Sequence, residues 1–519
     1  MPGTSTPPRR AELMPERPSI VLSGGGLRIE DVLRVMRERP PVAAEPAVLR
    51  RLQQARRVVE QHLGSGAPVY GLTTALGANV GKAIAPSELQ AYQSRAIQAR
   101  SVGIGEAASD ELVRGVLFTR LAGLSTGGSG ISPEVFDALL ALLNAGICPL
   151  IPRVGSIGVA DLPAMSHAML VLMGQGRARV GGKEVDGAQA LADAGLAPVA
   201  LGPKDGLALI SSNAWSVSCA IHAFDQAGQA LANLSRAATL TMEGFRANLS
   251  PLDARVQAAR PTPGQAAAAA HVRALLDGSG LWEKGAARRV QDPLSIRCVA
   301  QIHGAVLWAR QGLREHIECE LNGSGDSPLV VQEPDELLSS SNFHIPGLAL
   351  SLEALGVSLA QAASAAVQRC LRLYSPGASG LPMQLTQHGP EHSGFATVQK
   401  TLTALWSEVR HLANPACLDF FPVSEGAEDH ALMAPGVAAK TARLAERVTM
   451  IAAIEMLSAA QAVDLAQVSP RGAGTRDTYA RVRATAPVLD GDRPLGPDMD
   501  AIIGMLRERP FDPPEEAAP

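Results

Sequence analysis

Aromatic residues are scarce in this chain of 519 residues, at 3% of the sequence. Sandwiches and barrels of β-strands depend on aromatic and β-branched side chains, so this composition disfavours an all-β fold. Hydrophobic residues nevertheless make up 46% of the chain, and long Ala- and Leu-rich stretches favour helices. We expect a mostly α protein with a sizeable core, divided into two or three domains or forming one large composite domain.

The chain also has no charge excess and no paired cysteine motif. Its 46 basic and 50 acidic residues leave a formal net charge of −4, which disfavours a nucleic-acid-binding surface. The six cysteines include no Cys-x-x-Cys pair, so free thiols are expected rather than a zinc site or a disulfide scaffold. The first residues lack the apolar segment of a signal peptide. We therefore expect a cytoplasmic protein without a metal or a nucleic-acid partner.

The longest uncharged run, residues 206–224, is long enough to raise the question of a membrane span. It contains four serines, one asparagine and one histidine. These polar side chains fit a buried helix in a large helical protein better, so no membrane partner is expected.

Composition and helical spacing divide the chain into four segments. They are a disordered tail over residues 1–18, a loop-rich active-site domain over 19–205, a helical bundle over 206–470, and a C-terminal segment with a loose tail over 471–519. Within the first half, helices are predicted over 45–63 and 133–145. Ser132 and Pro133 are typical of the start of the second helix.

Two stretches of the second half, residues 347–374 and 436–467, are apolar on almost every helical face. A helix that is apolar on most faces is buried on most faces. The pattern therefore predicts a central bundle of long helices, or a subunit interface that covers what one chain leaves exposed.

The loops indicate where chemistry could occur. Tyr70 could act as an acid or base, although a packed tyrosine explains its loop better when the loop is taken alone. Arg297 stands in an apolar run and needs an acidic partner or a ligand, with a structural ion pair an equally good explanation. Asp161 is expected to cap the helix that follows it.

Two further polar loops contain Asn342 and His344, which are expected to brace neighbouring helices, and the acidic run of residues 424–430. That run fits no metal-ligand spacing, so a hydrogen-bonded loop is preferred. The chain has no P-loop, no Gly-x-Gly-x-x-Gly after a strand, no His-Glu-x-x-His and no Gly-x-Ser-x-Gly. Nucleotide hydrolases, Rossmann dehydrogenases, zincins and α/β-hydrolases are therefore disfavoured.

Nine short segments between about residue 20 and residue 470 follow one another in the order found in a single enzyme family. They are Tyr70–Gly77, Arg120–Gly130, Pro149–Gly158, Lys204–Ile210, Gln291–Gly304, Glu320–Pro328, Ser339–Ile345, Leu405–Val409 and Ala427–Met433. Together they resemble the aromatic amino acid ammonia-lyase family, which includes histidine, phenylalanine and tyrosine ammonia-lyases and the related aminomutases.

The resemblance implies a mostly α fold with a long-helix central bundle and a homotetramer whose active sites are shared between subunits. It also implies roles for the residues that are retained. Tyr70 corresponds to the catalytic base, Arg297 to the clamp for the substrate carboxylate, and Glu408 to a residue that helps set the side-chain pocket. Gln291 and Phe343 are retained site residues.

The family builds a methylidene-imidazolone group from an Ala-Ser-Gly triad that precedes Asp-Leu. The glycine amide must attack the alanine carbonyl, which needs a sharp turn without a Cβ in the way, and the serine must lose water. This chain instead reads Gly158, Val159, Ala160 and Asp161, one residue shorter and without a Ser-Gly pair. We therefore expect no methylidene-imidazolone and no other cofactor.

Other site positions also differ from the family. Arg100 stands at the position of a histidine, Ser211 at that of an asparagine, and Leu294 at that of a tyrosine. Arg100 and Arg297 together would favour the ionised form of Tyr70 and a substrate with a second anionic group.

Three hypotheses follow. The first is a lyase-like enzyme that acts on an amino-acid-like or other carboxylate substrate by elimination, addition or cyclisation without the internal electrophile. The second is an inactive homologue that acts as a binding or regulatory tetramer. The third is a conventional aromatic amino acid ammonia-lyase.

Overall fold

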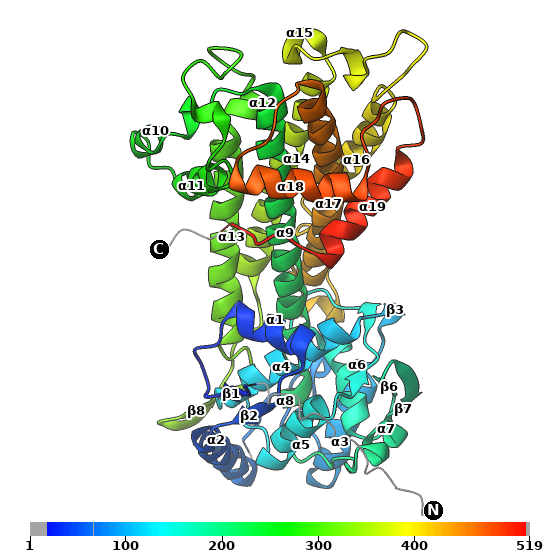
Figure 1. Cartoon of the computed structure of the whole chain (residues 1–519). Coiled ribbons are helices and arrows are strands. Elements are labelled where there is room, and N and C mark those ends of the chain that lie inside the picture. Colours follow the sequence, from blue (N-terminus) through cyan, green and yellow to red (C-terminus); the bar gives the residue numbers. More distant parts are fainter. Residues whose placement is uncertain (1–17, 66, 515–519) are drawn as a thin grey trace, which may run out of the picture. The chain divides into compact units, whose positions relative to one another are not determined.

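The computed structural model describes residues 18–65 and 67–514, and most of them are helical (Figure 1). The disorder expected over residues 1–18 lies outside this range except at Pro18. In the stretch expected to be a loose tail, Phe511 is buried, and the guanidinium carbons of Arg236 and Arg481 lie 4.3 and 4.5 Å from its ring centroid. The mostly α fold class is confirmed.

The chain forms two compact units, each discontinuous in sequence. Unit 1 contains the residues up to Gly155, Leu162–Ala214 and Leu321–Ser341, and unit 2 contains Ser156–Asp161, Trp215–Glu320 and the residues from Asn342. The domain boundaries expected after residues 18, 205 and 470 stay a prediction.

Unit 1 combines short helices with small sheets. Its helices are α1 (Ile29–Glu38), α2 (Pro46–Ser65), α3 (Leu89–Gln98), α4 (Asp110–Ser125), α5 (Pro133–Asn144), α6 (Leu162–Leu172), α7 (Gly187–Asp193) and α8 (Asp205–Ile210). Its strands are β1 (Ile20–Leu22), β2 (Val42–Ala44), β3 (Ile104–Ala107), β4 (Cys148–Pro149), β5 (Pro152–Val154), β6 (Arg177–Val180), β7 (Lys183–Asp186), β8 (Leu329–Gln332) and β9 (Asp335–Leu338). The pair β1–β2 is parallel, whereas β3–β5, β4–β6–β7 and β8–β9 are antiparallel.

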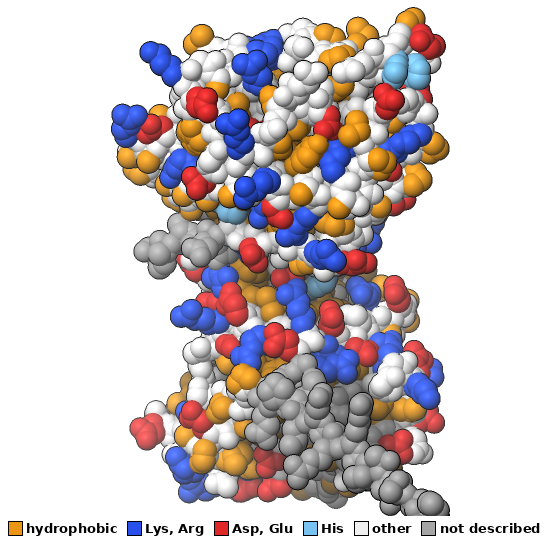
Figure 2. Space-filling model, viewed as in Figure 1, with side chains coloured by type: hydrophobic (Ala, Val, Ile, Leu, Met, Phe, Trp, Pro, Cys, Tyr) orange, Lys and Arg blue, Asp and Glu red, His pale blue; other side chains and the backbone are white. Residues whose placement is uncertain are grey.

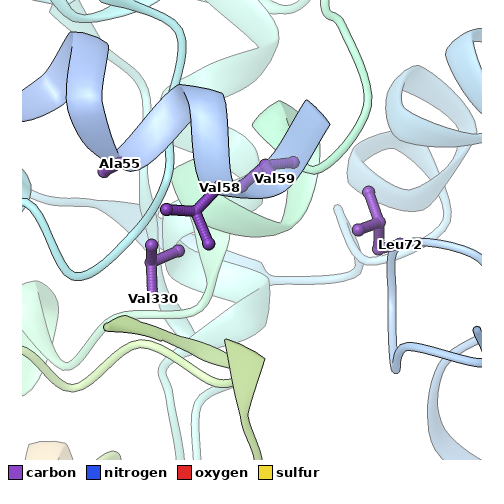
Figure 3. Packing of buried hydrophobic residues seen from close by; sticks show 5 residues of the cluster. All are labelled: Ala55, Val58, Val59, Leu72 and Val330. Atoms are coloured by element: carbon purple, nitrogen blue, oxygen red, sulfur yellow. The ribbon is translucent and has the colours of Figure 1, made fainter. Parts of the chain in front are cut away.

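The helices α2 and α5 confirm the two predicted in the first half. One face of α2 buries Ala55, Val58 and Val59 in a cluster with Leu72 and Val330, which brings the Tyr70 loop and β8 to the same helix (Figure 3). Pro133 occupies the first turn of α5 as expected.

Ser132 precedes α5, but its side chain does not cap the helix. Its hydroxyl donates instead to the buried carboxylate of Asp205, at 2.6 Å. The buried carboxylate of Asp205 is a strong acceptor that needs donors. The Ser132 hydroxyl therefore forms this tertiary hydrogen bond in place of the expected helix cap.

Unit 2 is built around long helices that run alongside one another (Figure 1). Its helices are α9 (Ala214–Phe245), α10 (Ala254–Ala258), α11 (Gln265–Leu275), α12 (Leu294–Arg297), α13 (Val299–Leu321), α14 (Pro346–Leu373), α15 (Pro376–Ser379), α16 (Val398–Leu412), α17 (Ala434–Leu465), α18 (Ala473–Thr485) and α19 (Gly496–Glu508). The helices predicted over 347–374 and 436–467 are α14 and α17, and they pack on each other.

Three helical stretches of the described chain are long and apolar enough to cross a membrane: Asp205–Phe245, Pro346–Leu373 and Ala434–Leu465. Their most apolar windows are 89%, 61% and 78% buried inside the protein. Burial between helices accounts for the uncharged run of residues 206–224, as expected. On the face in Figure 2, acidic and basic side chains are interspersed, in keeping with the small net charge.

A fully buried ion pair joins α14 to α17. Arg369 Nε lies 2.5 Å from Glu455 Oε1, and Arg369 Nη2 lies 2.8 Å from Oε2. The hydroxyl of Thr241 on α9 also donates to Glu455, and Arg369 Nη1 donates to the carbonyl of Ser295 on α12. The pair therefore fixes α12 against three long helices.

Replacing one partner leaves the other charge buried and uncompensated. We expect Arg369→Met to lower the free energy of unfolding by about 3–5 kcal/mol. The control Arg95→Met removes an ion pair whose two side chains are half exposed and costs at most about 1 kcal/mol. Denaturant titration of the two variants measures both values, and equal small losses would contradict the role given to Arg369.

Candidate functional site

The loop of residues 156–161 in unit 2 is organised around the carboxylate of Asp161, which is completely buried. Asp161 Oδ1 accepts from the Ser156 hydroxyl at 2.5 Å and from the Ser216 hydroxyl at 2.9 Å. Asp161 Oδ2 accepts from the backbone N–H of Ser216 at 2.7 Å. Burial raises the pKa of Asp161 to about 6, and these hydrogen bonds oppose the shift.

The backbone of this loop adopts left-handed torsion angles at residues that are not glycine. Ala160 has φ 55° and Asp161 has φ 39°, while Gly158 has φ 81°. A Cβ at Gly158 would lie 2.7 Å from the backbone nitrogen of Ala434, so only glycine fits there. Asp161 stands next to α6, but its side chain bonds to the two serines, contrary to the expected helix cap.

Two further segments of unit 2 contact the backbone of this loop. The N–H of Met433 donates to the carbonyl of Ile157 at 3.0 Å, and Val159 forms an antiparallel bridge with His344. His344 Nε2 in turn lies 2.9 Å from His430 Nδ1. Sequence patterns gave no signal for this histidine pair, because 86 residues separate its members.

The loop containing His430 is hydrogen-bonded, as expected from its sequence. Val423 N–H donates to the Glu428 carbonyl at 3.0 Å, and the Ser424 hydroxyl donates to the Glu428 carboxylate at 3.0 Å. Within the described part of the chain, no group of three or more His, Cys, Asp or Glu side chains is placed to hold a metal ion.

Arg297, at the end of α12, is half-buried, and its Nε is inaccessible to solvent. That Nε has no hydrogen-bond partner among the residues the structure describes. The structural ion pair considered from the sequence is therefore not seen within these residues. A buried guanidinium nitrogen without a partner is suited to a carboxylate supplied from outside them.

The other expected site residues of unit 2 differ in exposure. Leu294 is 62% exposed, and Gln291 is also exposed. Phe343 is half-buried beside His344. Glu408 is half-exposed and forms an ion pair with Arg447, whose Nε lies 2.6 Å from the carboxylate.

Unit 1 carries Tyr70, Arg100 and Ser211. Tyr70 is 39% exposed, and its hydroxyl oxygen accepts from the N–H of Gly77 at 3.1 Å. Arg100 Nη1 donates to the carbonyl of Ala96 in α3 at 3.0 Å. Ser211 is buried at the end of α8. The expected effect of Arg100 on Tyr70 stays a prediction.

Unit 1 also contains a buried charge cluster that the sequence did not reveal as a unit. Arg120 Nη2 lies 2.8 Å from Asp326 Oδ1, with both side chains buried. Lys204 donates to the Ser129 carbonyl, and burial lowers the pKa of Lys204 to about 8 although the Asp326 charge opposes this. Arg120 and Asp326 form an ion pair and Lys204 is hydrogen-bonded within the protein, which gives three of the nine segments a structural role.

Comparison with known proteins agrees with the segment order. The family model for aromatic amino acid lyases matches residues 27–484. The chain belongs to the aromatic amino acid lyase family. It therefore belongs among the carbon–nitrogen lyases, and its fold is that of the ammonia-lyases.

Individual relatives within the family are similar over almost the whole chain. A histidine ammonia-lyase from Symbiobacterium thermophilum is 36% identical over 93% of this chain and 96% of that protein. The crystal structure of ergothionase from Treponema denticola, an ergothioneine-degrading enzyme, has a TM-score of 0.92 at 30% identity and covers 95% of this chain and 99% of that one. Tyrosine aminomutase from Streptomyces globisporus has a TM-score of 0.88 at 30% identity and covers 94% and 97%.

The raised pKa of Asp161 makes stability depend on pH. In the folded state the Asp161 carboxyl keeps its proton up to about pH 6, whereas in the unfolded chain it loses the proton near its usual pKa. The free energy of unfolding therefore falls as the pH rises between these two pKa values. We expect the advantage of the wild type over Asp161→Asn to be larger at pH 4.5 than at pH 7. Melting temperatures at both values test this, with the exposed Asp490→Asn as control, and a pH-independent difference would contradict it.

Proposed function

We propose that this chain is a carbon–nitrogen lyase that eliminates an amine from an amino-acid-like carboxylate without a methylidene-imidazolone group. The observation that carries the proposal is the loop of residues 156–161. In the family, the ring needs a serine that loses water and a following glycine amide. Here Val159 and Ala160 precede Asp161, and Ser156 is followed by Ile157. The Ser156 hydroxyl donates to Asp161, so these residues do not fit the ring.

An elimination without this electrophile requires a leaving group that departs readily. A quaternary ammonium nitrogen keeps its positive charge at every pH and leaves as a neutral tertiary amine. Ergothionase is described as degrading ergothioneine, a betaine that carries such a nitrogen. Its similarity to this chain supports a betaine of an imidazole-bearing amino acid as the substrate class.

Arg297 and Tyr70 have separate roles in the proposed reaction. The unpartnered Nε of Arg297 binds the substrate carboxylate, and the contact of Arg369 with Ser295 keeps α12 in position. Tyr70 takes a proton from the carbon next to the one that bears nitrogen. The C–H electron pair forms the carbon–carbon double bond, and the C–N pair leaves with the amine. The hydrogen bond from the Gly77 N–H to the Tyr70 hydroxyl oxygen holds this side chain in position.

We also propose that the protein works as a cytoplasmic homotetramer with active sites shared between subunits. Three large apolar side chains on the long helices of unit 2 are exposed in the single chain: Trp308 (59%), Leu350 (56%) and Val357 (44%). Contact with another subunit would remove these apolar side chains from water. The described chain contains six free cysteines, in keeping with a reducing compartment.

The conventional ammonia-lyase hypothesis has independent support. The curated relatives at 33–36% identity are named histidine ammonia-lyases, which favours this hypothesis over an inactive or ring-free protein. The two active hypotheses differ in the amine that leaves. Incubation with ergothioneine and with histidine, followed by separate assays for trimethylamine and ammonia, distinguishes them. We expect trimethylamine release from the betaine, whereas ammonia release from histidine at a higher rate would favour the conventional enzyme.

Removing the Arg297 guanidinium should weaken ligand binding more than it destabilises the fold. A charge-assisted, bidentate contact contributes about 1.5–3 kcal/mol, so Arg297→Ala should weaken ergothioneine binding by roughly ten- to hundredfold. Arg297→Lys keeps the positive charge but loses the paired N–H donors of the guanidinium. Its dissociation constant for ergothioneine should lie between those of the wild type and Arg297→Ala. Calorimetric titration measures both. If Arg297→Ala unfolds and the wild type binds neither ergothioneine nor histidine, the role of Arg297 is structural.

Replacing Tyr70 with Phe removes only the hydroxyl. We expect turnover to fall about 10²–10⁴-fold, as for loss of a general base, while the dissociation constant changes little. Tyr92→Phe is a matched control. The hydroxyl of Tyr92, on α3, also accepts from a backbone N–H of the Tyr70 loop, that of Leu76, at 3.0 Å. Equal effects of the two substitutions on kcat would assign Tyr70 a structural role.

A further inference from the structure

A groove between three helices of unit 2 has no role in the reaction described so far. It lies where α16, α17 and α19 meet (Figure 1), and its volume is about 610 Å³. Pockets that hold small molecules typically measure about 300–1,000 Å³. Each of the three helices contributes two apolar side chains to the lining, which are Val398 and Leu405, Met450 and Ile454, and Met499 and Ile503.

The groove has an apolar floor and a polar rim. Ile454 and Met499 are buried, whereas Thr397, just before α16, and Thr401, within it, are exposed. The floor favours a ligand with an apolar part, because contact removes that part from water. It gives no preference for the charge of the ligand, which therefore depends on the ionised side chains around the rim.

One rim carboxylate is held in place by backbone donors. Asp492 accepts from the N–H of Ser393 at 2.7 Å and from that of Gly394 at 2.9 Å. These hydrogen bonds hold the pKa of Asp492 below its usual value, so the group is ionised at neutral pH. His392 Nδ1 accepts the N–H of Asp492 at 3.4 Å, so this nitrogen carries no proton toward the carboxylate.

The second rim carboxylate is unpaired. Asp500 lines the groove from α19, and its carboxylate has neither a hydrogen bond nor an ion pair among the described residues. Arg493 is the basic side chain of the lining, but its guanidinium pairs with Asp498 and donates to the carbonyl of Pro487. The rim therefore has an excess of negative charge beside an apolar floor.

We propose that the groove between α16, α17 and α19 binds an organic cation with an apolar body, such as an amine that carries an alkyl chain. The apolar body covers Ile454 and Met499, and the ammonium group pairs with the carboxylates of Asp492 and Asp500. An anionic ligand would be repelled by both carboxylates, and a neutral ligand would gain nothing from them. The site is independent of the proposed function, because its lining residues take no part in the elimination.

Three probes with the same apolar chain test the preference for a cation. Octylamine, octanol and octanoate carry a positive, no and a negative charge at pH 7, and calorimetric titration of the full chain measures each dissociation constant. We expect octylamine to bind about three- to thirtyfold more tightly than octanol, because each exposed ion pair adds a modest attraction. Octanoate should bind more weakly than octanol. Equal affinities, or no binding of octylamine, would overturn the proposal.

A change of charge at the rim assigns the cation to this groove. Asp500→Asn removes one charge at nearly constant size and should weaken octylamine binding about two- to fivefold, with octanol binding unchanged. Asp490→Asn is the matched control, because it alters an exposed carboxylate outside the lining, and it should change neither. If Asp500→Asn leaves octylamine binding unchanged, the cation binds elsewhere and the site is wrong.

Filling the groove tests its apolar floor. Ile503→Trp should weaken the binding of octylamine and octanol alike by about tenfold or more, and unchanged binding would contradict the site. If this variant does not fold, Asp500→Asn still decides the matter. The alternative occupant is a second copy of the chain. In that case octylamine does not bind and Ile503→Trp lowers the oligomeric mass in light scattering, which would overturn the ligand site and leave the proposed elimination unaffected.

Discussion

The buried carboxylate of Asp161 holds the backbone on which the account of this protein depends. Left-handed torsion angles at Ala160 and Asp161 cost about 1–3 kcal/mol each. Hydrogen bonds to a charged group contribute about 1.5–3 kcal/mol each, so the bonds from Ser156 and Ser216 offset this strain. With that backbone fixed, Val159 is able to pair with His344, and Ile157 with Met433.

The loop of residues 156–161 is also where this chain differs from the family pattern. Family membership therefore establishes the fold and the enzyme class, but not the reaction. Similarity over almost the entire chain establishes the lyase fold and its place among the carbon–nitrogen lyases. The chemistry of the relatives named histidine ammonia-lyases need not follow, because the residues before Asp161 are Val159 and Ala160. A leaving group that departs without an internal electrophile is consistent with both the family fold and this altered loop.

The sequence predicted the long helices α2, α14 and α17 because apolar spacing is a local property. It identified Arg297 from a charge in an apolar run, but not the side chains that meet only after folding. Arg120, Lys204 and Asp326 lie in separate segments, and their cluster depends on tertiary packing. Ser132 and Asp161 were expected to cap helices, and both form tertiary hydrogen bonds instead, since a buried acid competes with the helix end for donors and acceptors.

The mass of the intact chain tests the central claim most directly, because ring formation in the family removes two water molecules from the backbone. The account predicts that the purified protein has the full mass of its sequence and no absorbance band at wavelengths beyond that of tryptophan. A mass lower by two water molecules, located by peptide mapping to residues 155–162, would contradict it and establish a conventional ammonia-lyase.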